Sequence, residues 1–439
     1  MNKYRILYIL PGLLWVSGLA AYAAEKPPQK TGSADTTAVS ASDASLQQTA
    51  ELDPDGNITA EARRSISRYQ QTIDALQRTH GVYHDQLGEQ LLGLGLVYRN
   101  QGQHEQAIEV LKRSLHINRI NKGLHNTSQL PILELIIETN TALSDWQALD
   151  KNYHYLYWVH LRNYANEDPR LLPIIDRLGR WHINAYQLQS DELLFRHLLD
   201  ANALYKNAVA IIETHYGQFD PRLIDPLYAI ALTNYLMAAY ASNIENSDDI
   251  RSSYTGSRHR RRLSEQEIAQ QNLLANSYRT GKRAMTRIID IYESNPQLPS
   301  DSHALALIHL GDWHQLFNKR TTAMMNYQQA YAFLSEHQTD TLDIDKLFAR
   351  PRTLPAIQLP LPYKNKQDNK NKPSVLVSFN VTKTGRAKNI QIIESDPADD
   401  ASLRRRAKKS VKLTRFRPRL ENGKPVETTD VSIRYIYDE

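Results

Sequence analysis

The sequence predicts an α+β multidomain protein, in which an all-α helical-repeat solenoid is followed by a small β-β-α-β-β domain. Three observations predict it. Apolar residues recur with helical spacing from about residue 60 to about residue 348. Within this region, similar residue sets return after roughly 42 positions, which indicates stacked helix pairs. From residue 374 the pattern changes to an alternation of apolar and polar residues, which is typical of strands.

Composition and net charge exclude several classes of function for this chain. Its 439 residues exceed one ordinary domain, and its 53 Lys and Arg against 48 Asp and Glu give a net charge of +5. Residues 374–439 alone hold 14 basic and 9 acidic residues, so the whole excess lies there. No basic stripe with interleaved aromatic residues accompanies it, and we expect no nucleic-acid partner. The chain has no cysteine, which excludes disulfides and a lipidated cysteine anchor.

The first residues have the pattern of an export signal. Lys3 and Arg5 precede the apolar stretch 6–20, and Ala21-Tyr22-Ala23 forms a small-x-small cleavage site. We therefore interpret residues 1–23 as a signal peptide and expect the mature protein in the periplasm.

The alternative is an uncleaved anchor that keeps the protein at the periplasmic side of the inner membrane. Residues 6–24 carry no charge and are nearly long enough to span a bilayer. Pro11-Gly12 within the stretch favours cleavage instead. Residues 24–56, rich in Ser, Thr, Ala, Gln and Pro, are expected to form a disordered linker because they hold too few large apolar residues to form a core.

Two stretches carry the clearest repeat pattern. The first consists of Leu91, Leu94, Gly95, Tyr98, Gly102, Ala107, Leu111 and Ser114. The second consists of Leu307, Leu310, Gly311, His314, Ala323, Tyr327 and Ala330, with Asn318 in place of the turn glycine. Small residues such as Gly95 and Ala107 suit positions where two helices approach closely. Both stretches resemble the tetratricopeptide family, which implies antiparallel helix pairs.

The region between them keeps a weaker period. Gly81 and Gly123 lie 42 residues apart, and Asp-Pro-Arg-Leu occurs at 168–171 and again at 220–223. Asp followed by Pro is a helix-start signal, because Asp caps free amide groups and Pro fits the first turn. This spacing resembles the kinesin-light-chain type of repeat. We expect four or five helix pairs in a solenoid over residues 57–348.

Two segments interrupt this pattern. Residues 242–264 contain few apolar residues and the basic run 258–262, and they indicate a long loop that is either simply solvated or able to bind an acidic partner or anionic lipid. Residues 349–373 contain five prolines, which favours an extended linker or a strap against the solenoid.

The C-terminal residues, 374–439, predict each element of a small domain. Val375, Val377, Phe379 and Val381 alternate with polar residues, and Gly385 supplies the turn to a second strand over 388–394. A helix is expected over 399–413, with acidic residues at its start and lysines at its end, as the helix dipole favours. Asn422-Gly423 is a hairpin signal, and 431–437 alternates as the last strand.

This order, with Phe416-x-Pro418 after the helix and Gly423-x-Pro425-Val426 before the last strand, resembles the C-terminal domain of the TonB family. The resemblance implies an exposed sheet edge to which a short segment of an outer-membrane receptor adds as a strand. The residues that it assigns to partner binding are Val431, Ser432, Ile433, Arg434, Tyr435, Ile436 and Tyr437. The other interpretation is an edge that the chain itself caps, or an inert descendant of the family.

The sequence lacks the common catalytic and metal motifs. It has no His-Glu-x-x-His, no Gly-rich phosphate loop and no Gly-x-Ser-x-Gly turn, and we expect no enzyme, no cofactor and no metal. His154, His160 and His314 are interpreted as surface or packing residues. The aromatic cluster Tyr153, Tyr155, Tyr157 and Trp158 is interpreted as core packing, with a peptide-binding groove as the alternative.

The sequence therefore favours a non-enzymatic periplasmic adaptor whose partners are cell-envelope proteins, among them an outer-membrane receptor, with membrane contact only if the N-terminal segment is uncleaved. The alternative is a TonB-type energy transducer for receptor-dependent transport. Against it, the apolar segment 6–24 lacks the histidine of energy-transducing members, and the long proline-rich spacer is absent. A third hypothesis is a regulatory subunit associated with an enzyme.

Overall fold

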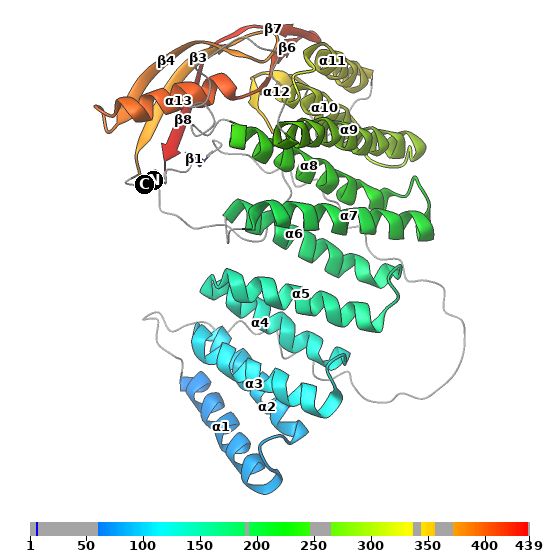
Figure 1. Ribbon diagram of the computed structural model, residues 1–439, viewed down its shortest axis with the longest axis vertical. Coiled ribbons are helices and arrows are strands. Elements are labelled where there is room, and N and C mark those ends of the chain that lie inside the picture. The colour runs from blue at the N-terminus through cyan, green and yellow to red at the C-terminus, as the bar shows by residue number, and fades with distance from the viewer. Residues whose placement is uncertain are drawn as a thin grey trace.

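The computed structural model describes residues 6–7, 60–188, 193–245, 265–336, 344–355 and 372–437. Its helices stack from α1 at one end to a sheet-containing C-terminal domain at the other (Figure 1). Most of the predicted signal peptide, the linker 24–56 and the basic run 258–262 lie outside the described residues. Among the described residues, no helix is long and apolar enough to cross a membrane.

The described helices form five antiparallel pairs, preceded by α1 (Ala60–His80) and followed by the short α12 (Ile344–Phe348). The pairs are α2 (Asp85–Asn100) with α3 (His104–Lys122), α4 (Leu130–Leu143) with α5 (Trp146–Asn163), α6 (Leu172–Leu188) with α7 (Leu194–Tyr216), α8 (Ile224–Glu245) with α9 (Glu265–Ser294), and α10 (Ser300–Leu316) with α11 (Arg320–Glu336). The predicted helical-repeat solenoid is confirmed.

Helices α1, α3 and α7 each end at a glycine. Gly81, Gly123 and Gly217 have φ of 86°, 89° and 96°, a left-handed conformation that favours glycine. After Gly217 comes the second Asp-Pro-Arg-Leu motif, in which the Asp220 side chain accepts a hydrogen bond from the Arg222 amide and begins a 3-10 turn, η3 (Pro221–Leu223). Asp168 does the same for η2 (Pro169–Leu171). The predicted start and stop signals are therefore confirmed.

Small residues lie where paired helices touch. A Cβ built on Gly95 would lie 2.6 Å from Leu111 of the partner helix, and one on Gly311 would lie 2.5 Å from Tyr327. Real Cβ atoms do not approach so closely, so a larger residue would push the two helices of the pair apart. In the turn of the last pair, Asn318 has φ of 63°, which is the left-handed conformation expected of a glycine substitute.

A ladder of side-chain hydrogen bonds joins successive repeats, and the sequence period did not reveal it. Near the C-terminal end of the second helix of four pairs, a side chain donates to a backbone carbonyl in the turn that connects the preceding repeat to that pair. The pairs are Asn121 with Tyr83 at 2.8 Å, Asn163 with His125 at 2.6 Å, His215 with Glu167 at 2.8 Å and Asn295 with Phe219 at 2.9 Å. Each bond satisfies a carbonyl outside the helices and fixes the offset between repeats.

The structure adjusts one predicted boundary. Helix α8 continues through Glu245, three residues beyond the expected start of the loop at 242. The reason is local: Ser242-Asn243-Ile244-Glu245 contains neither Gly nor Pro, so nothing in it ends a helix. The rest of the predicted loop, 246–264, lies outside the described residues.

The C-terminal domain is built around one antiparallel sheet. Strand β3 (Ser374–Val381) lies between β4 (Ala387–Asp396) and β8 (Thr428–Tyr437), and β1 (Ile6–Leu7) pairs with the end of β8. Helix α13 (Ala401–Leu413) covers one face of the sheet, where Leu403, Ala407 and Val411 pack against Val375, Val377 and Phe379. Asp400 caps the helix by accepting from the Ser402 and Leu403 amides. The predicted fold class is confirmed.

The segment after α13 differs from a simple pair of strands. Strand β5 (Phe416–Arg417) leaves the main sheet and pairs with β2 (Arg352–Thr353) from the proline-rich segment. The short strands β6 (Arg419–Glu421) and β7 (Lys424–Val426) form a hairpin of their own at Asn422-Gly423. Pro418 accounts for the break, because it has no amide proton to continue a ladder. The described start of the proline-rich segment thus forms a strap against the domain.

A buried ion pair fixes the domain to the end of the solenoid. Arg417 of β5 donates to both carboxylate oxygens of Asp312 on α10, at 2.9 and 2.5 Å, and both side chains are almost fully buried. Burial opposes the charge of Arg417, but Asp312 outweighs it and raises the pKa of the guanidinium. Gln315, one turn later, donates to the carbonyls of Thr384 and Phe416 at 2.7 and 3.0 Å. The domain is therefore a rigid cap on α10 and α11.

Candidate functional site: the edge of strand β8

Strand β8 holds all seven residues that the sequence assigned to partner binding. From Val431 to Ile436 it runs beside β3 in unbroken register, with Val431 opposite Phe379 and Ile436 opposite Ser374. The register shift between these strands lies before Val431, toward Asp430, which has φ of 56°. The predicted segment is therefore a strand of regular register beside β3.

Side chains of β8 alternate between the two faces of the sheet. Tyr435 and Tyr437 are buried beneath α13, and Val431 and Ile433 pack against the same core. Ser432, Arg434 and Ile436 consequently lie on the opposite face. There, Arg434 donates to Glu394 of β4 at 2.5 Å, across the intervening β3. Both charged side chains are about half exposed, so this ion pair contributes little to stability.

The backbone N–H and C=O groups of β8 point alternately toward β3 and away from it, and one hydrogen bond shows which residues point which way. The Tyr437 amide donates to the Pro373 carbonyl at 2.9 Å, on the β3 side. In an antiparallel ladder both backbone groups of a residue point the same way, and the next residue points the other way. The backbone groups of Ser432, Arg434 and Ile436 therefore point away from β3, toward the open edge. These are the groups that an added strand would bind.

Part of this edge is already paired. Strand β1 lies antiparallel to β8, with Leu7 opposite Ile436 and Ile6 opposite Tyr437. Figure 1 shows β1 beside the end of β8. Among the described residues, no strand pairs with this edge between Thr428 and Tyr435. Within the part of the chain that the structure describes, the outward groups of Ser432 and Arg434 thus have no neighbouring strand and are open to a partner strand.

A polar hollow lies on the outer face of the same sheet. It has a volume of about 400 Å³ and is lined by Ser378, Asn380, Asn389, Ile390, Gln391 and Asp430. Its lining offers amides and one carboxylate but no buried catalytic pair. The hollow begins where β8 becomes regular, so a strand added along β8 would pass beside it.

The aromatic residues and His314, which the sequence singled out in the solenoid, lie in packed positions. Tyr153 is buried in the core of the middle repeats, and Tyr155, Tyr157 and Trp158 are partly buried against it. His314 is buried and shares a hydrogen bond with the Tyr278 hydroxyl at 3.0 Å. Burial lowers the pKa of His314 to about 4, which keeps this ring neutral.

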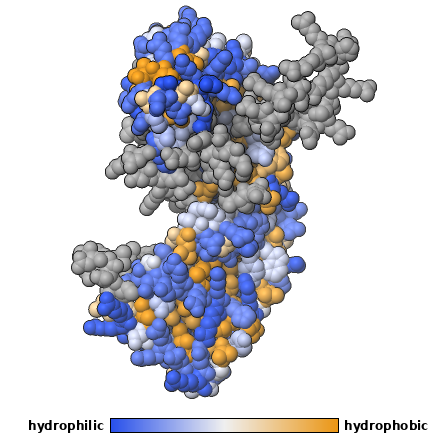
Figure 2. Space-filling model, turned by 60° about the vertical axis from the view of Figure 1, so that its left-hand side comes forward, coloured by the Kyte–Doolittle hydropathy of each residue, from blue (hydrophilic) through white to orange (hydrophobic). Residues whose placement is uncertain are grey.

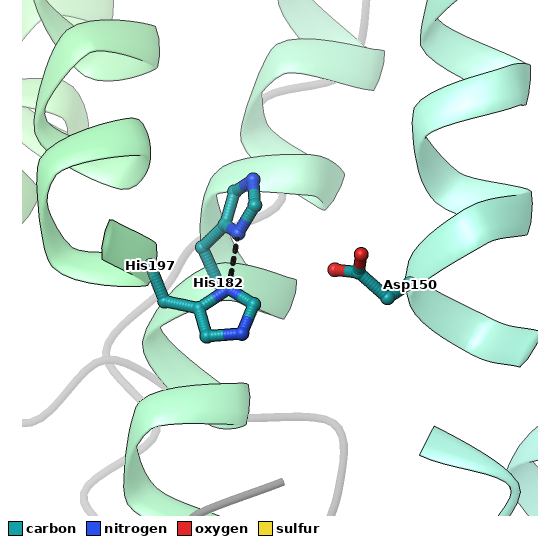
Figure 3. Close-up of side chains that lie close together, drawn as sticks. All are labelled: Asp150, His182 and His197. Atoms are coloured by element: carbon teal, nitrogen blue, oxygen red, sulfur yellow. Dashed lines mark hydrogen bonds between the residues drawn. The ribbon is translucent and has the colours of Figure 1, made fainter. Parts of the chain in front are cut away.

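Sequence reasoning missed one group of side chains, Asp150, His182 and His197. They come from three different helices and lie together in the solenoid (Figure 3). No short motif joins them, because they are 32 and 15 residues apart. Only the packing of α5 against α6 and α7 brings them together.

Comparison with known proteins agrees with the two parts of the chain. Residues 364–437 match the family described as the Gram-negative bacterial TonB protein C-terminal domain. No curated protein matches the chain. The chain thus combines a tetratricopeptide-like solenoid with a small domain that matches the TonB C-terminal family.

Solved structures resemble the helical region only loosely. A putative kinesin light chain from Podosopora anserina with nearly identical TPR-like repeats has 16% sequence identity and a TM-score of 0.37, and the match covers 58% of this chain and 98% of that one. BtubC (BKLC) from P. vanneervenii has 14% identity and a TM-score of 0.34, with 65% and 97% covered. The assignment of the repeat rests on the helix pairs themselves.

Proposed function

We propose that this protein is a non-enzymatic periplasmic adaptor that receives an extended segment of a cell-envelope protein along the edge of β8. The observation that carries the proposal is the regular strand from Val431 to Ile436, whose outward backbone groups at Ser432 and Arg434 are open among the described residues. Backbone hydrogen bonds would supply affinity, and the exposed Arg434 side chain would favour an acidic or polar residue opposite it. A receptor of the outer membrane is one such partner.

The solenoid would hold a second protein. Large apolar side chains are exposed at or beside three of the turns between repeats: Val82, Tyr83, Leu124, Tyr216 and Phe219. Figure 2 shows hydrophobic surface interspersed with hydrophilic surface over the N-terminal half of the stack. The buried ion pair between Arg417 and Asp312 would keep the two binding surfaces in a fixed relation. A rigid two-ended arrangement suits a scaffold that brings two envelope proteins together.

Replacing Ser432 by proline tests the β8 edge directly. Proline removes an amide proton that points outward and leaves the ladder to β3 intact, because edge strands tolerate proline at such positions. We expect Ser432→Pro to reduce recovery of envelope proteins that bind β8 by at least about tenfold, since one lost backbone bond and a steric block add up to more than 1.4 kcal/mol. Recovery is measured by quantitative mass spectrometry of proteins captured from envelope extract.

The matched control is Ser432→Ala, which removes the hydroxyl but keeps the amide proton. It should recover the same proteins as the unaltered chain. Circular dichroism and the melting temperature establish that both variants are folded. Equal recovery by folded Ser432→Pro and Ser432→Ala would overturn the binding edge.

The N-terminus of the mature protein separates the adaptor from a TonB-type energy transducer, the function that the family match also favours. An adaptor should begin at Ala24 after cleavage, because Ala21-Tyr22-Ala23 has the small residues of a processing site. Cleavage would also remove β1 (Ile6–Leu7), so in the mature adaptor the outward backbone groups of Ile436 would join those of Ser432 and Arg434 as binding groups. Mass spectrometry of protein from fractionated cells measures this. An intact Met1 in the membrane fraction would contradict the periplasmic adaptor and support the transducer.

A further inference from the structure

Three consecutive helices each direct one metal-binding side chain to a common point. Asp150 lies on α5, His182 on α6 and His197 on α7. One potential ligand atom of each lies within 4.8 Å of the others. Figure 3 shows the Asp150 carboxylate facing the two imidazole rings from the neighbouring repeat. His182 and His197 are 1% and 5% exposed, so the two rings are shielded from solvent.

The donor atoms have the chemistry of a zinc-type site. Two imidazoles and a carboxylate, with a position left for water, form a common ligand set for Zn²⁺ and related ions. The Nδ1 atoms of His182 and His197 lie 2.8 Å apart. Ligand nitrogens on a tetrahedral Zn²⁺ are separated by about 3.3 Å, given bonds of 2.0–2.1 Å. A shift of about half an ångström would therefore place both nitrogens on one ion.

Neighbouring side chains orient these ligands. The indole N–H of Trp181 donates to one carboxylate oxygen of Asp150 at 2.7 Å, which is the kind of outer hydrogen bond that positions a metal ligand. His154, one helical turn after Asp150, lies edge-on to His182 with ring centroids 5.1 Å apart.

We propose that Asp150, His182 and His197 bind one divalent transition-metal ion of the zinc class, which ties the repeat of α4 and α5 to the repeat of α6 and α7. The ion would replace the hydrogen bond between the two imidazoles by two bonds to metal. A water molecule would take the fourth position. Because the ligands belong to adjacent repeats, the ion would stabilise the stack and set the angle between them.

Cobalt and zinc titrations of the full chain without a polyhistidine tag test the site. Co²⁺ should bind at one ion per chain with the visible absorption of a four-coordinate site, Zn²⁺ should displace it, and Zn²⁺ should raise the melting temperature. His197→Gln keeps a polar side chain but removes a ligand, and we expect at least a 100-fold loss of Zn²⁺ affinity. His314→Gln replaces a buried histidine far from the cluster in sequence and should bind as the unaltered chain does.

A second variant distinguishes loss of the metal site from loss of folding. Asp150→Asn keeps an oxygen that can accept from Trp181 but lacks the charge, and it should weaken Zn²⁺ binding by about 10- to 100-fold. Failure of the unaltered chain to bind Co²⁺ or Zn²⁺ would overturn the proposal and leave a plain hydrogen bond between two histidines. Binding of equal strength in Asp150→Asn would also overturn it, because the ion would then lie elsewhere.

Discussion

Replacing Arg417 by methionine while Asp312 is kept should destabilise the junction between the solenoid and the C-terminal domain by about 3–5 kcal/mol. The reason is desolvation. The Asp312 carboxylate is 1% exposed. Without Arg417 it would keep, among the described residues, the hydrogen bond from the Tyr327 hydroxyl, at 2.8 Å, and the electrostatic interaction with Arg352, but no ion pair. A buried carboxylate without its counter-charge costs far more than the net value of the pair. Chemical unfolding measures the loss, and hydrogen exchange of 382–386 and 416–417 places it at the junction.

Two further variants test whether the buried, unpaired Asp312 carboxylate causes the loss of stability. Replacing both partners, Asp312→Leu with Arg417→Met, should restore most of the lost stability, because no charge is then buried alone. Breaking the exposed pair by Arg434→Ala should cost less than about 1 kcal/mol. A loss below 1 kcal/mol in Arg417→Met, or a double variant less stable than the single one, would contradict the account.

Gly385→Ala should destabilise the same junction by more than about 2 kcal/mol. Gly385 has φ of 70°, and a Cβ at this position would lie 2.0 Å from the Phe416 carbonyl oxygen and 2.1 Å from the Gln315 amide nitrogen. The backbone conformation alone costs about 1 kcal/mol for alanine. The clash adds to it, because the blocked oxygen belongs to the backbone and accepts from Gln315. Thermal unfolding and hydrogen exchange at the hairpin measure the effect.

Gly102→Ala supplies a matched control. Gly102 also has φ of 70°, but a Cβ there would have nothing within 4 Å. It should show only the conformational cost of about 1 kcal/mol. The difference between the two variants isolates the close approach of the hairpin to Phe416. Equal effects of Gly385→Ala and Gly102→Ala would mean that the junction yields and that the cap is less rigid than the structure indicates.

Strand β8 shows what a local sequence pattern can predict and what it cannot. Alternation in 431–437 was enough to predict a strand and to say that Val431, Ile433, Tyr435 and Tyr437 share a face, because strand geometry has a period of two. It could not say which residues turn their amides outward. That depends on the pairing with β3, which is set by residues more than fifty positions earlier. The partial cover by β1 comes from the other end of the chain.

The junction and the metal-type cluster depend wholly on tertiary contacts. Arg417 is the unspecified position of the Phe416-x-Pro418 step, and nothing local marks it as buried, yet it is 1% exposed and paired with a residue 105 positions away. Asp150, His182 and His197 carry no spacing that a motif search recognises. Side chains from different helices meet only when the stack has formed, and no local rule encodes the angle between two repeats.

The sequence by itself determined the helical period, the turns at Gly81 and Gly123, the helix starts at the Asp-Pro motifs and the alternation of the last strand. These features follow from interactions within a few residues: caps, left-handed turns and apolar stripes. The tertiary structure alone decided that the C-terminal domain caps the solenoid, which amides of β8 face outward, and that two histidines and an aspartate meet between repeats. Those depend on contacts between residues distant in the chain, where buried charge and close packing select one arrangement.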